Sequence, residues 1–341
     1  MTDHVRLTSP PSVPMADAAA WHRVVAASMA HDLPGVPAPA PEQIQAQLAT
    51  PGLDSRRLTW LATASDDVVT GVAALRLFSS PGRDHLAELQ LHVDPAHRLR
   101  GTGSLLLSAV LDACRADNRR SLITETAADS PGEAFCERSG FSRALTLNHL
   151  VLSLADVDWT EVDELADAER PGYRLAGWTG TVPDVLADAF AAAKNAMNDM
   201  PVGDLDYGTS QWDADRVRSM AEVVSGRGDT LLTVAAVHED GSMAGYTEIV
   251  LPRGGTARAE QYDTAVVPAH RGHGLGLWVK AAMLRRLRAE HPAVTAVRTD
   301  NAEDNVHMID VNRRLGFGTE RRTHEYQLDL PTRPKPSPLT R

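Results

Sequence analysis

The order of apolar and polar positions along this 341-residue chain occurs twice. Apolar runs of strand length, mixed with apolar positions at helical spacing, predict the secondary structure of each part. In the first part we expect strands at residues 58–63, 68–77 and 86–93, a helix at 101–117, a strand at 121–126, a short helix at 132–138 and closing strands at 141–154. In the second part we expect helices at 183–197 and 213–224, strands at 230–237, 244–251 and 260–267, a helix at 274–290, a strand at 294–299, a helix at 305–315 and strands at 317–330. The pattern therefore predicts a tandem duplication of one α+β unit.

The boundary between the two parts is predicted from composition. An acidic stretch that carries Pro171-Gly172 follows the first part, and a Pro-rich stretch ends the sequence. A single hydrophobic core rarely extends beyond about 250 to 300 residues, so this length favours two domains. We expect a first domain at 1–155, a linker at 156–172, a second domain at 173–330 and a disordered tail at 331–341.

A glycine-rich loop lies between the third strand and the next helix of each part. It is PAHRLRGTG at residues 95–103 and PAHRGHGLG at residues 268–276, so that Arg98 and Arg271 are 173 positions apart. Backbone amides at the start of a helix lack partners and bind anions, and glycines let a ligand approach them closely. The loops therefore predict a pyrophosphate site. Neither loop has the G-x-G-x-x-G spacing of a dinucleotide fold or the Gly-Lys-Ser/Thr of a P-loop.

Both loops match R-x-x-G-x-G, and with them the chain resembles the GCN5-related N-acetyltransferases (GNAT), whose corresponding loop holds the pyrophosphate of acetyl-CoA. The closing patterns that end in Gly140-Phe141 and Gly316-Phe317 are similar to the last helix and exit of that family. The resemblance implies two tandem GNAT domains, each with a mixed, mostly antiparallel sheet flanked by helices. The tandem arrangement is similar to mycothiol synthase and its relatives, which implies that catalysis belongs to the C-terminal copy.

The resemblance also implies a set of coenzyme contacts, because the strand before the loop splays from its neighbour and its amides pair with the pantetheine. In the second copy the implied residues are Thr264, Ala265, Val266, Val267, Arg271, Gly272, His273, Gly274, Leu275, Gly276, Asn301 and Asn305. In the first copy they are Leu91, His92, Val93, Arg98, Leu99, Arg100, Gly101, Thr102, Gly103 and Ser104. The same amides could stabilise an oxyanion. No metal is implied.

Catalysis requires a base, because an alkylammonium must lose a proton before it attacks a thioester. Glu260 stands eleven residues before Arg271, where the family's general base often lies, and is the first candidate. Asp263 is the rival, on the opposite face of the strand unless a bulge intervenes. In the first copy the corresponding position by count is Ala87, with Glu88 adjacent. Either acid could instead be a solvated strand residue.

The family often uses a tyrosine of the last helix to protonate the leaving thiolate, but the matching positions here hold Asn312 and Cys136. Coenzyme A could leave as a thiolate, since a thiol pKa of roughly 8.5 permits it. Tyr326 and Tyr262 are the possible substitutes, and either could be a packed strand aromatic. We expect Cys136 to be a buried structural thiol.

Acceptor recognition is expected in the polar connector at residues 194–213, which is rich in turn-forming residues. The candidates for binding a cationic or polyhydroxylated amine are Asn198, Asp199, Asp204, Asp206 and Tyr207. An ordinary solvated loop is the alternative for each of them.

Charge and composition narrow the class of protein. A net charge of −11 argues against a nucleic-acid or anionic-membrane binder and weakly favours cationic ligands, while 43% apolar residues support real cores. Two cysteines give no disulfide framework. Residues 1–20 lack the apolar core of a signal peptide and no run reaches membrane-spanning length, so we expect neither a signal peptide nor a membrane span. We expect a cytoplasmic protein that is a monomer or homodimer.

The sequence thus predicts an acetyl-CoA-dependent N-acetyltransferase that acts on a primary amine of a small molecule by direct attack. An acyl-CoA sensor that has lost catalysis is the alternative, favoured by the missing tyrosine. A tandem aminoacyl-tRNA-dependent transferase of related fold ranks last, because it would need a basic surface and would not need two pyrophosphate loops.

Overall fold

The computed structural model describes residues 6–8, 14–50, 52–254 and 257–331, which form two compact units. The first unit contains the described residues up to Leu145, Asp204–Gly208 and the residues from His324 onward. The second contains Thr146–Gly203 and Thr209–Thr323. The units therefore do not coincide with simple halves of the sequence.

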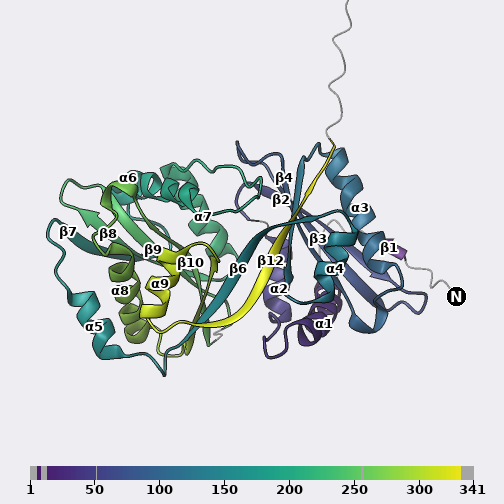
Figure 1. Ribbon diagram of the computed structural model, residues 1–341, viewed down its shortest axis with the longest axis horizontal. Helices are drawn as coiled ribbons and strands as arrows, with labels where there is room; N and C mark the ends of the chain where they lie inside the picture. The colour runs from purple at the N-terminus through teal and green to yellow at the C-terminus, as the bar shows by residue number, and fades with distance from the viewer. Residues whose placement is uncertain (1–5, 9–13, 51, 255–256, 332–341) are drawn as a thin grey trace, which may run out of the picture. The chain divides into compact units, whose positions relative to one another are not determined.

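The first unit is built mainly from the first repeat (Figure 1). Its elements are β1 (Arg6–Thr8), α1 (Met15–Asp32), α2 (Pro41–Ala49), β2 (Ser55–Thr63), β3 (Val69–Phe78), β4 (Leu86–Val93), the 3-10 turn η1 (Pro95–His97), α3 (Thr102–Ala116), β5 (Ser121–Ala127), α4 (Pro131–Arg138) and the start of β6 (Ser142–Ser153). The second unit contains α5 (Trp159–Asp167), β7 (Tyr173–Thr179), α6 (Asp184–Lys194), η2 (Asn195–Asp199), α7 (Ala214–Gly226), β8 (Thr230–His238), β9 (Met243–Leu251), β10 (Arg258–Val266), η3 (Pro268–His270), α8 (Leu275–Glu290), β11 (Ala296–Ala302), α9 (Val306–Arg314) and the start of β12 (Gly318–Asp329).

Each unit has a mixed sheet with helices on it, as predicted. The strand order is β1-β2-β3-β4-β5-β12 in the first unit and β6-β11-β10-β9-β8-β7 in the second. The pairs β4–β5 and β10–β11 are parallel, whereas β1–β2, β2–β3, β3–β4, β6–β11, β7–β8, β8–β9 and β9–β10 are antiparallel. The predicted α+β class is confirmed.

The closing strands cross between the units. β6 begins in the first unit and ends in the second, and β12 takes the opposite course. Leu150 and Leu152 of β6 are buried in the core of the second unit, and Tyr326 and Leu330 from the end of the second repeat are buried in the core of the first. Each sheet therefore includes residues from the other repeat.

The cores follow the apolar pattern. In the second unit α5 and α8 pack on one face of the sheet around Leu232 and Val234, and α6 packs on the other face around Ala235 and Tyr246. Neighbouring strand residues thus point to opposite faces, as strand geometry requires. The interiors of β8 and β9 are apolar almost throughout because both faces are covered.

Several elements differ from the expected pattern. The segment expected as a linker contains α5, whose Val162 and Leu165 are buried, and β7 begins directly after it. The helices α1 and α2 lie in a part of the chain for which no element was expected, since the Ala-rich α1 has a weak contrast between its faces. The expected disordered tail lies outside the described residues apart from Pro331.

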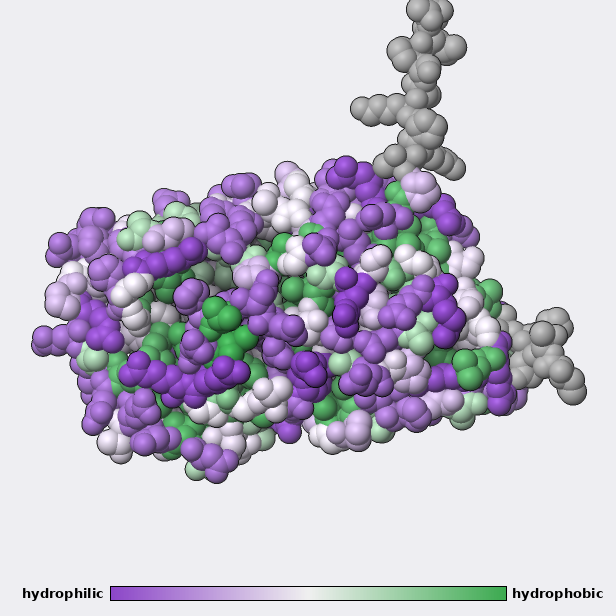
Figure 2. Space-filling model, viewed as in Figure 1, coloured by the Kyte–Doolittle hydropathy of each residue, from purple (hydrophilic) through white to green (hydrophobic). Residues whose placement is uncertain are grey.

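On the face shown in Figure 2, hydrophilic residues surround small groups of hydrophobic ones. Within the described ranges, no helix combines the length and the apolar character needed to cross a bilayer.

Candidate functional site

Each R-x-x-G-x-G loop is fixed by its arginine. The Nε atom of Arg98 donates to the carbonyl of Val93 at 3.2 Å, and Nε of Arg271 donates to the carbonyl of Val266 at the same distance. In both copies the arginine therefore ties the loop to the last residue of the preceding strand.

The loops present free amides at a helix N-terminus. Gly101 and Gly274 cap α3 and α8 in the left-handed region, with φ of 89° and 70°. In the part of the chain that the structure describes, no acceptor receives the backbone N–H groups of Gly272, His273, Gly274, Leu275 and Gly276. These amides lie at the positive end of the helix dipole, so the loop can bind a phosphate group. Leu99 takes the left-handed conformation that Gly272 takes in the second copy.

The strand before each loop has one open edge. The parallel pairing of β10 with β11 ends at Glu260, and that of β4 with β5 ends at Leu89. Since the amide of Val267 donates to β9, alternation directs the backbone groups of Thr264 and Val266 to the open edge. The same alternation applies to Leu91 and Val93. These edges have the form that the expected pantetheine pairing requires.

A β-bulge distinguishes the two copies. The register between β9 and β10 shifts between Gln261 and Thr264, whereas β3 and β4 pair without a shift. The extra residue of the bulge turns Asp263 to the face of Glu260, away from Gln261, which contacts α8. The structure therefore contains the bulge that the sequence left open, and Asp263 lies on the same face of β10 as Glu260.

The bulge also corrects the expected match between the copies. Glu260 pairs with Val250 and Arg298, and the equivalent ladder position in the first copy is Glu88, which pairs with Arg76 and Ile123. Counting residues from the loop had placed Ala87 there, because a count ignores the extra residue. The side chain of Glu88 forms an ion pair with Arg76 at 3.6 Å.

Glu260 is half-buried, and its carboxylate accepts no hydrogen bond from the described residues. Burial raises its pKa above the ordinary value for a glutamate, although Arg298 and Arg321 oppose this effect. Both arginines are engaged by Glu320, at 3.0 and 2.7 Å. A carboxylate with a raised pKa and no fixed partner can accept a proton near neutral pH.

A buried lysine links two carboxylates beside this strand. Nζ of Lys194 donates to Glu248 at 2.6 Å and to Asp263 at 2.8 Å. Burial would lower the pKa of Lys194, but Asp263 and Glu248 hold it well above its ordinary value. The rings of Tyr246 and Trp212 flank the ammonium, with centroids 5.1 and 4.7 Å away. Asp263 keeps 34% of its side chain exposed.

A second buried lysine lies on the other face of the sheet. Nζ of Lys280 in α8 donates to Oε1 of Gln261 at 2.8 Å, and Gln261 donates to Thr247. Burial lowers the pKa of Lys280 to about 7.

The two tyrosine candidates belong to different units. Tyr326 is buried in the core of the first unit, where its hydroxyl donates to Glu137 at 3.4 Å, and burial raises its pKa to about 12. Tyr326 therefore belongs to the first unit, whereas Glu260 belongs to the second. Tyr262 stays in β10 and is 39% exposed. Cys136 is buried, as expected, and burial raises its pKa to about 12.

The expected acceptor residues are divided between the units. Asp206 accepts a hydrogen bond from Ser121 in the first unit, and Tyr207 stacks on Arg83 there, 4.1 Å from its ring centroid. The amide of Asp204 likewise donates to the carbonyl of Ala144.

In the second unit, Asn198 exchanges two hydrogen bonds with the backbone of Ser210 and thereby braces the connector. Asp199 pairs with Arg271 at 3.0 Å, so it lies beside the R-x-x-G-x-G loop of the second unit.

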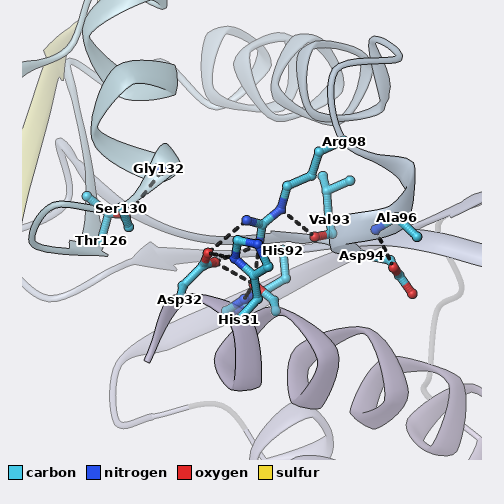
Figure 3. A network of polar contacts seen from close by, with 11 residues as sticks. His31, Asp32, His92, Val93, Asp94, Ala96, Arg98, Thr126, Ser130 and Gly132 are labelled. Atoms are coloured by element: carbon cyan, nitrogen blue, oxygen red, sulfur yellow. Dashed lines mark hydrogen bonds and ion pairs between the residues drawn. The ribbon is translucent and has the colours of Figure 1, made fainter. Parts of the chain in front are cut away.

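The first unit has an arginine–carboxylate pair at the same place. Arg98 binds both carboxylate oxygens of Asp32 at the end of α1, at 2.7 and 2.6 Å, with His31 and His92 close by (Figure 3). Burial acts to raise the pKa of Asp32, but the hydrogen bonds from Arg98, His31 and Ser28 and the charge of Arg98 together lower it. Burial lowers the pKa of His92 to about 4.

Asn305 and Asn301 serve the local structure of the second unit. Asn305 caps α9 by accepting from the amide of Met308, and Asn301 accepts from Asn312 at 2.6 Å. Among the described residues, no group of three or more His, Cys, Asp or Glu side chains is arranged to hold a metal ion.

Three buried charged residues of the second unit, Lys194, Glu248 and Lys280, were not among the predicted site residues. Each is a charged residue inside an apolar run, in AAAKNA, GYTEIVL and LWVKAAM. A buried charge requires a partner. A charged residue that interrupts an apolar run was therefore the sequence signal that could have identified these three positions.

Comparisons with known proteins agree with this architecture. The acetyltransferase (GNAT) family model matches residues 27–141 and 199–317. The chain is 30% identical over 263 residues to the mycothiol acetyltransferase of Kineococcus radiotolerans, covering 75% of this chain and 77% of that protein. It is 32% identical over 252 residues to that of Clavibacter sepedonicus, covering 72% of each. A tandem GNAT protein from the clavulanic acid biosynthesis pathway, 26% identical, superposes with a TM-score of 0.80 over 97% of this chain and 100% of that one.

Proposed function

The chain belongs to the acetyltransferase (GNAT) family, and on that premise we propose that its second unit transfers an acetyl group from acetyl-CoA to a primary amine of a small molecule. One observation carries the proposal. The open edge of β10 runs from Glu260 to the free amides of the R-x-x-G-x-G loop, with a bulge between them.

In this proposal the loop of Gly272–Gly276 holds the pyrophosphate, because its amides are unpaired and lie at the start of α8. The open edge at Thr264 and Val266 pairs with the pantetheine. The same amides stabilise the oxyanion that forms when the amine attacks the thioester carbonyl.

Glu260 is the proposed general base. It receives a proton from the acceptor ammonium, and its raised pKa brings it closer to neutrality, where a base works best. Asp263 is the weaker candidate because Lys194 already occupies its carboxylate at 2.8 Å. We assign Asp263 instead to holding the acceptor, since its exposed part can bind an ammonium group. Coenzyme A then departs as a thiolate.

The acceptor is proposed to be a small cationic molecule. The negative charge of the chain favours it electrostatically, and two relatives named as mycothiol acetyltransferases also favour a small-molecule acceptor. We place this activity in the cytoplasm, where the free thiols of Cys114 and Cys136 fit a reducing environment.

The first unit is proposed to bind acetyl-CoA without catalysing transfer. Its loop and open edge resemble those of the second unit, but β4 has no bulge and Glu88 is paired with Arg76.

Glu260→Gln tests the assignment. We expect turnover of an amine to fall by about 10²–10⁴-fold, the usual contribution of a general base, with the affinity for acetyl-CoA unchanged. The rate of the parent protein should rise with pH through the pKa of Glu260, because only the ionised carboxylate accepts a proton. Asp263→Asn is the matched comparison and should raise KM more than it lowers kcat. Full activity of Glu260→Gln would refute the role of Glu260.

A further inference from the structure

The coenzyme loop of the second unit is flanked by cationic and aromatic side chains that the pyrophosphate site does not require. They are Arg170, Tyr173, His238, His270 and His273. His270 and His273 belong to the loop itself. Arg170 lies just before β7, Tyr173 is the first residue of β7, and His238 is the last residue of β8.

A tight turn brings Arg170 to the loop. The amide of Tyr173 donates to the carbonyl of Arg170, with Pro171 and Gly172 between them and a φ of 82° at Gly172. Proline at the second and glycine at the third position fix a type II turn. Nη2 and Nε of Arg170 lie 3.7 and 3.8 Å from the place where a Cβ would stand on Gly274. The guanidinium therefore lies beside the free amides.

Arg170 has unused hydrogen-bonding capacity. Its Nη1 donates to the carbonyl of Glu169 at 3.1 Å, while Nε is shielded from solvent and has no hydrogen-bond partner among the described residues. An arginine in this state favours a planar or tetrahedral anion that accepts two hydrogen bonds.

Tyr173 orders the imidazoles around it. Its hydroxyl lies 3.1 Å from Nδ1 of His270, and its ring lies 5.7 Å from the ring of His273 and 5.1 Å from that of His238. When the hydroxyl donates to Nδ1, the neutral imidazole of His270 carries its proton on Nε2 and can donate to a ligand. His273 is exposed at the helix start.

The acidic side chains near this cluster determine which of its donors can bind an anion. Asp240 pairs with His238 at 3.0 Å, and the carboxyl carbon of Glu239 lies 4.0 Å from the Cβ position of Gly172. These acids lie on the His238 side, whereas Arg170 and His273 flank Gly274. The donors nearest the loop are thus the ones available to an anion.

We infer that Arg170, His270 and His273 form a second phosphate subsite, which binds the phosphate monoester on the ribose of coenzyme A next to the pyrophosphate. The inference rests on the proposed function of this loop. The loop amides suffice for a diphosphate, and the additional guanidinium and imidazole donors match a separate, more highly charged phosphate group. In the first unit, Ala64 occupies the ladder position of His238, so this part of the cluster is absent there.

The experiment compares the affinities of coenzyme A and 3′-dephospho-coenzyme A by titration calorimetry, with the full chain carrying Gly101→Val to limit binding to the second unit. We expect coenzyme A to bind about 10-fold or more tightly. Arg170→Ala and His273→Ala should bring the ratio of the two affinities close to one by weakening coenzyme A alone. Arg174→Ala is the control, because this neighbouring exposed arginine lies on the opposite face of β7 from Tyr173.

Equal affinities in the parent chain, or an equal loss for both ligands in Arg170→Ala, would overturn the inference and assign these donors to the pyrophosphate. If neither ligand binds, the proposed function fails together with the inference. Tyr173→Phe adds a milder test, because it removes only the hydroxyl that orients His270. It should lower the ratio of the affinity for coenzyme A to that for 3′-dephospho-coenzyme A while leaving the affinity for 3′-dephospho-coenzyme A unchanged.

Discussion

The two repeats share a loop but differ in the strand that leads to it. Arg98 and Arg271 make the same contact with the end of the strand, and both copies leave an edge open. Only β10 contains a bulge, and it directs Asp263 to Lys194. The comparison teaches that two copies can share the same glycine-rich loop while a local irregularity in the preceding strand changes the face on which an acidic side chain lies.

The cores of the two units also differ at equivalent positions. The ladder position of Glu248 is occupied by Ala74 in the first copy, and the helix position of Lys280 by Leu107, both buried. The second unit thus contains buried charges where the first has an ordinary apolar core. Replacing a buried ion pair by apolar residues is often neutral or stabilising, so the charges of the second unit are not explained by the stability of its core.

The largest effect is expected from Lys194→Met. The change leaves Glu248 buried without its cation, which should lower the free energy of unfolding by about 3–5 kcal/mol. Urea unfolding of the full chain measures it. The double variant Lys194→Met/Glu248→Leu, which makes this region apolar like the first unit, should recover most of the loss. A loss of less than about 1 kcal/mol in the single variant would show that the pair is not coupled to folding.

Next in size are the loop glycines. Gly274→Val and Gly101→Val place a β-branched residue at a φ of 70° or 89°, at a cost of about 1–3 kcal/mol, and bring a side chain to the free amides. Each variant should lose one bound acetyl-CoA, counted by native mass spectrometry. If both glycines can be replaced with no change in stoichiometry, the loops are structural and do not hold the coenzyme.

The buried Lys280 predicts a pH dependence of stability. The unfolded chain keeps this lysine protonated up to about pH 10.4, whereas the folded protein releases the proton at about pH 7. The unfolded state therefore binds more protons between these values, so stability should rise with pH by up to ~1.4 kcal/mol per unit. Below pH 7 this contribution is flat. Lys280→Leu, which copies Leu107, should remove the slope in urea unfolding at pH 7–9, and an unchanged slope would contradict the assignment.

The smallest predicted effect is a difference in stability between variants of the two loop arginines. Arg98 makes two bonds to the largely buried Asp32, so Arg98→Ala should destabilise the chain by about 1–2 kcal/mol. Arg271 and Asp199 are about half exposed, and Arg271→Ala should cost only about 0–1 kcal/mol. Since the pKa of Asp32 is lowered, its share of the stability is lost as the pH falls through the acid range. Equal effects of the two variants in thermal unfolding would remove this distinction.

The sequence sufficed for the features that depend on neighbours along the chain. The repeat, the strand-loop-helix order and the glycine loops follow from apolar spacing and from backbone conformations that glycine adopts most easily. The bulge at Gln261–Thr264 could not be predicted, because it is defined by pairing with β9. The contact of Lys194 with Glu248 joins residues 54 positions apart and has no local pattern.

The last strand, β12, shows a second limit of prediction from the sequence. Tyr326 belongs to the second repeat in sequence and to the core of the first unit in the fold. The alternation of β12 is the same whichever sheet the strand joins, so periodicity could not place this tyrosine.

The crossing of β12 also sets the order in which the protein can mature during synthesis. The first unit needs Tyr326 in its core and Leu330, whose amide donates to the carbonyl of Arg120. A ribosome that adds about 5–20 residues per second reaches Leu330 roughly 10 to 40 s after Leu145. The part of the chain that is made first is thus the last to be completed, and during that interval its open sheet edge must be kept from pairing with other chains.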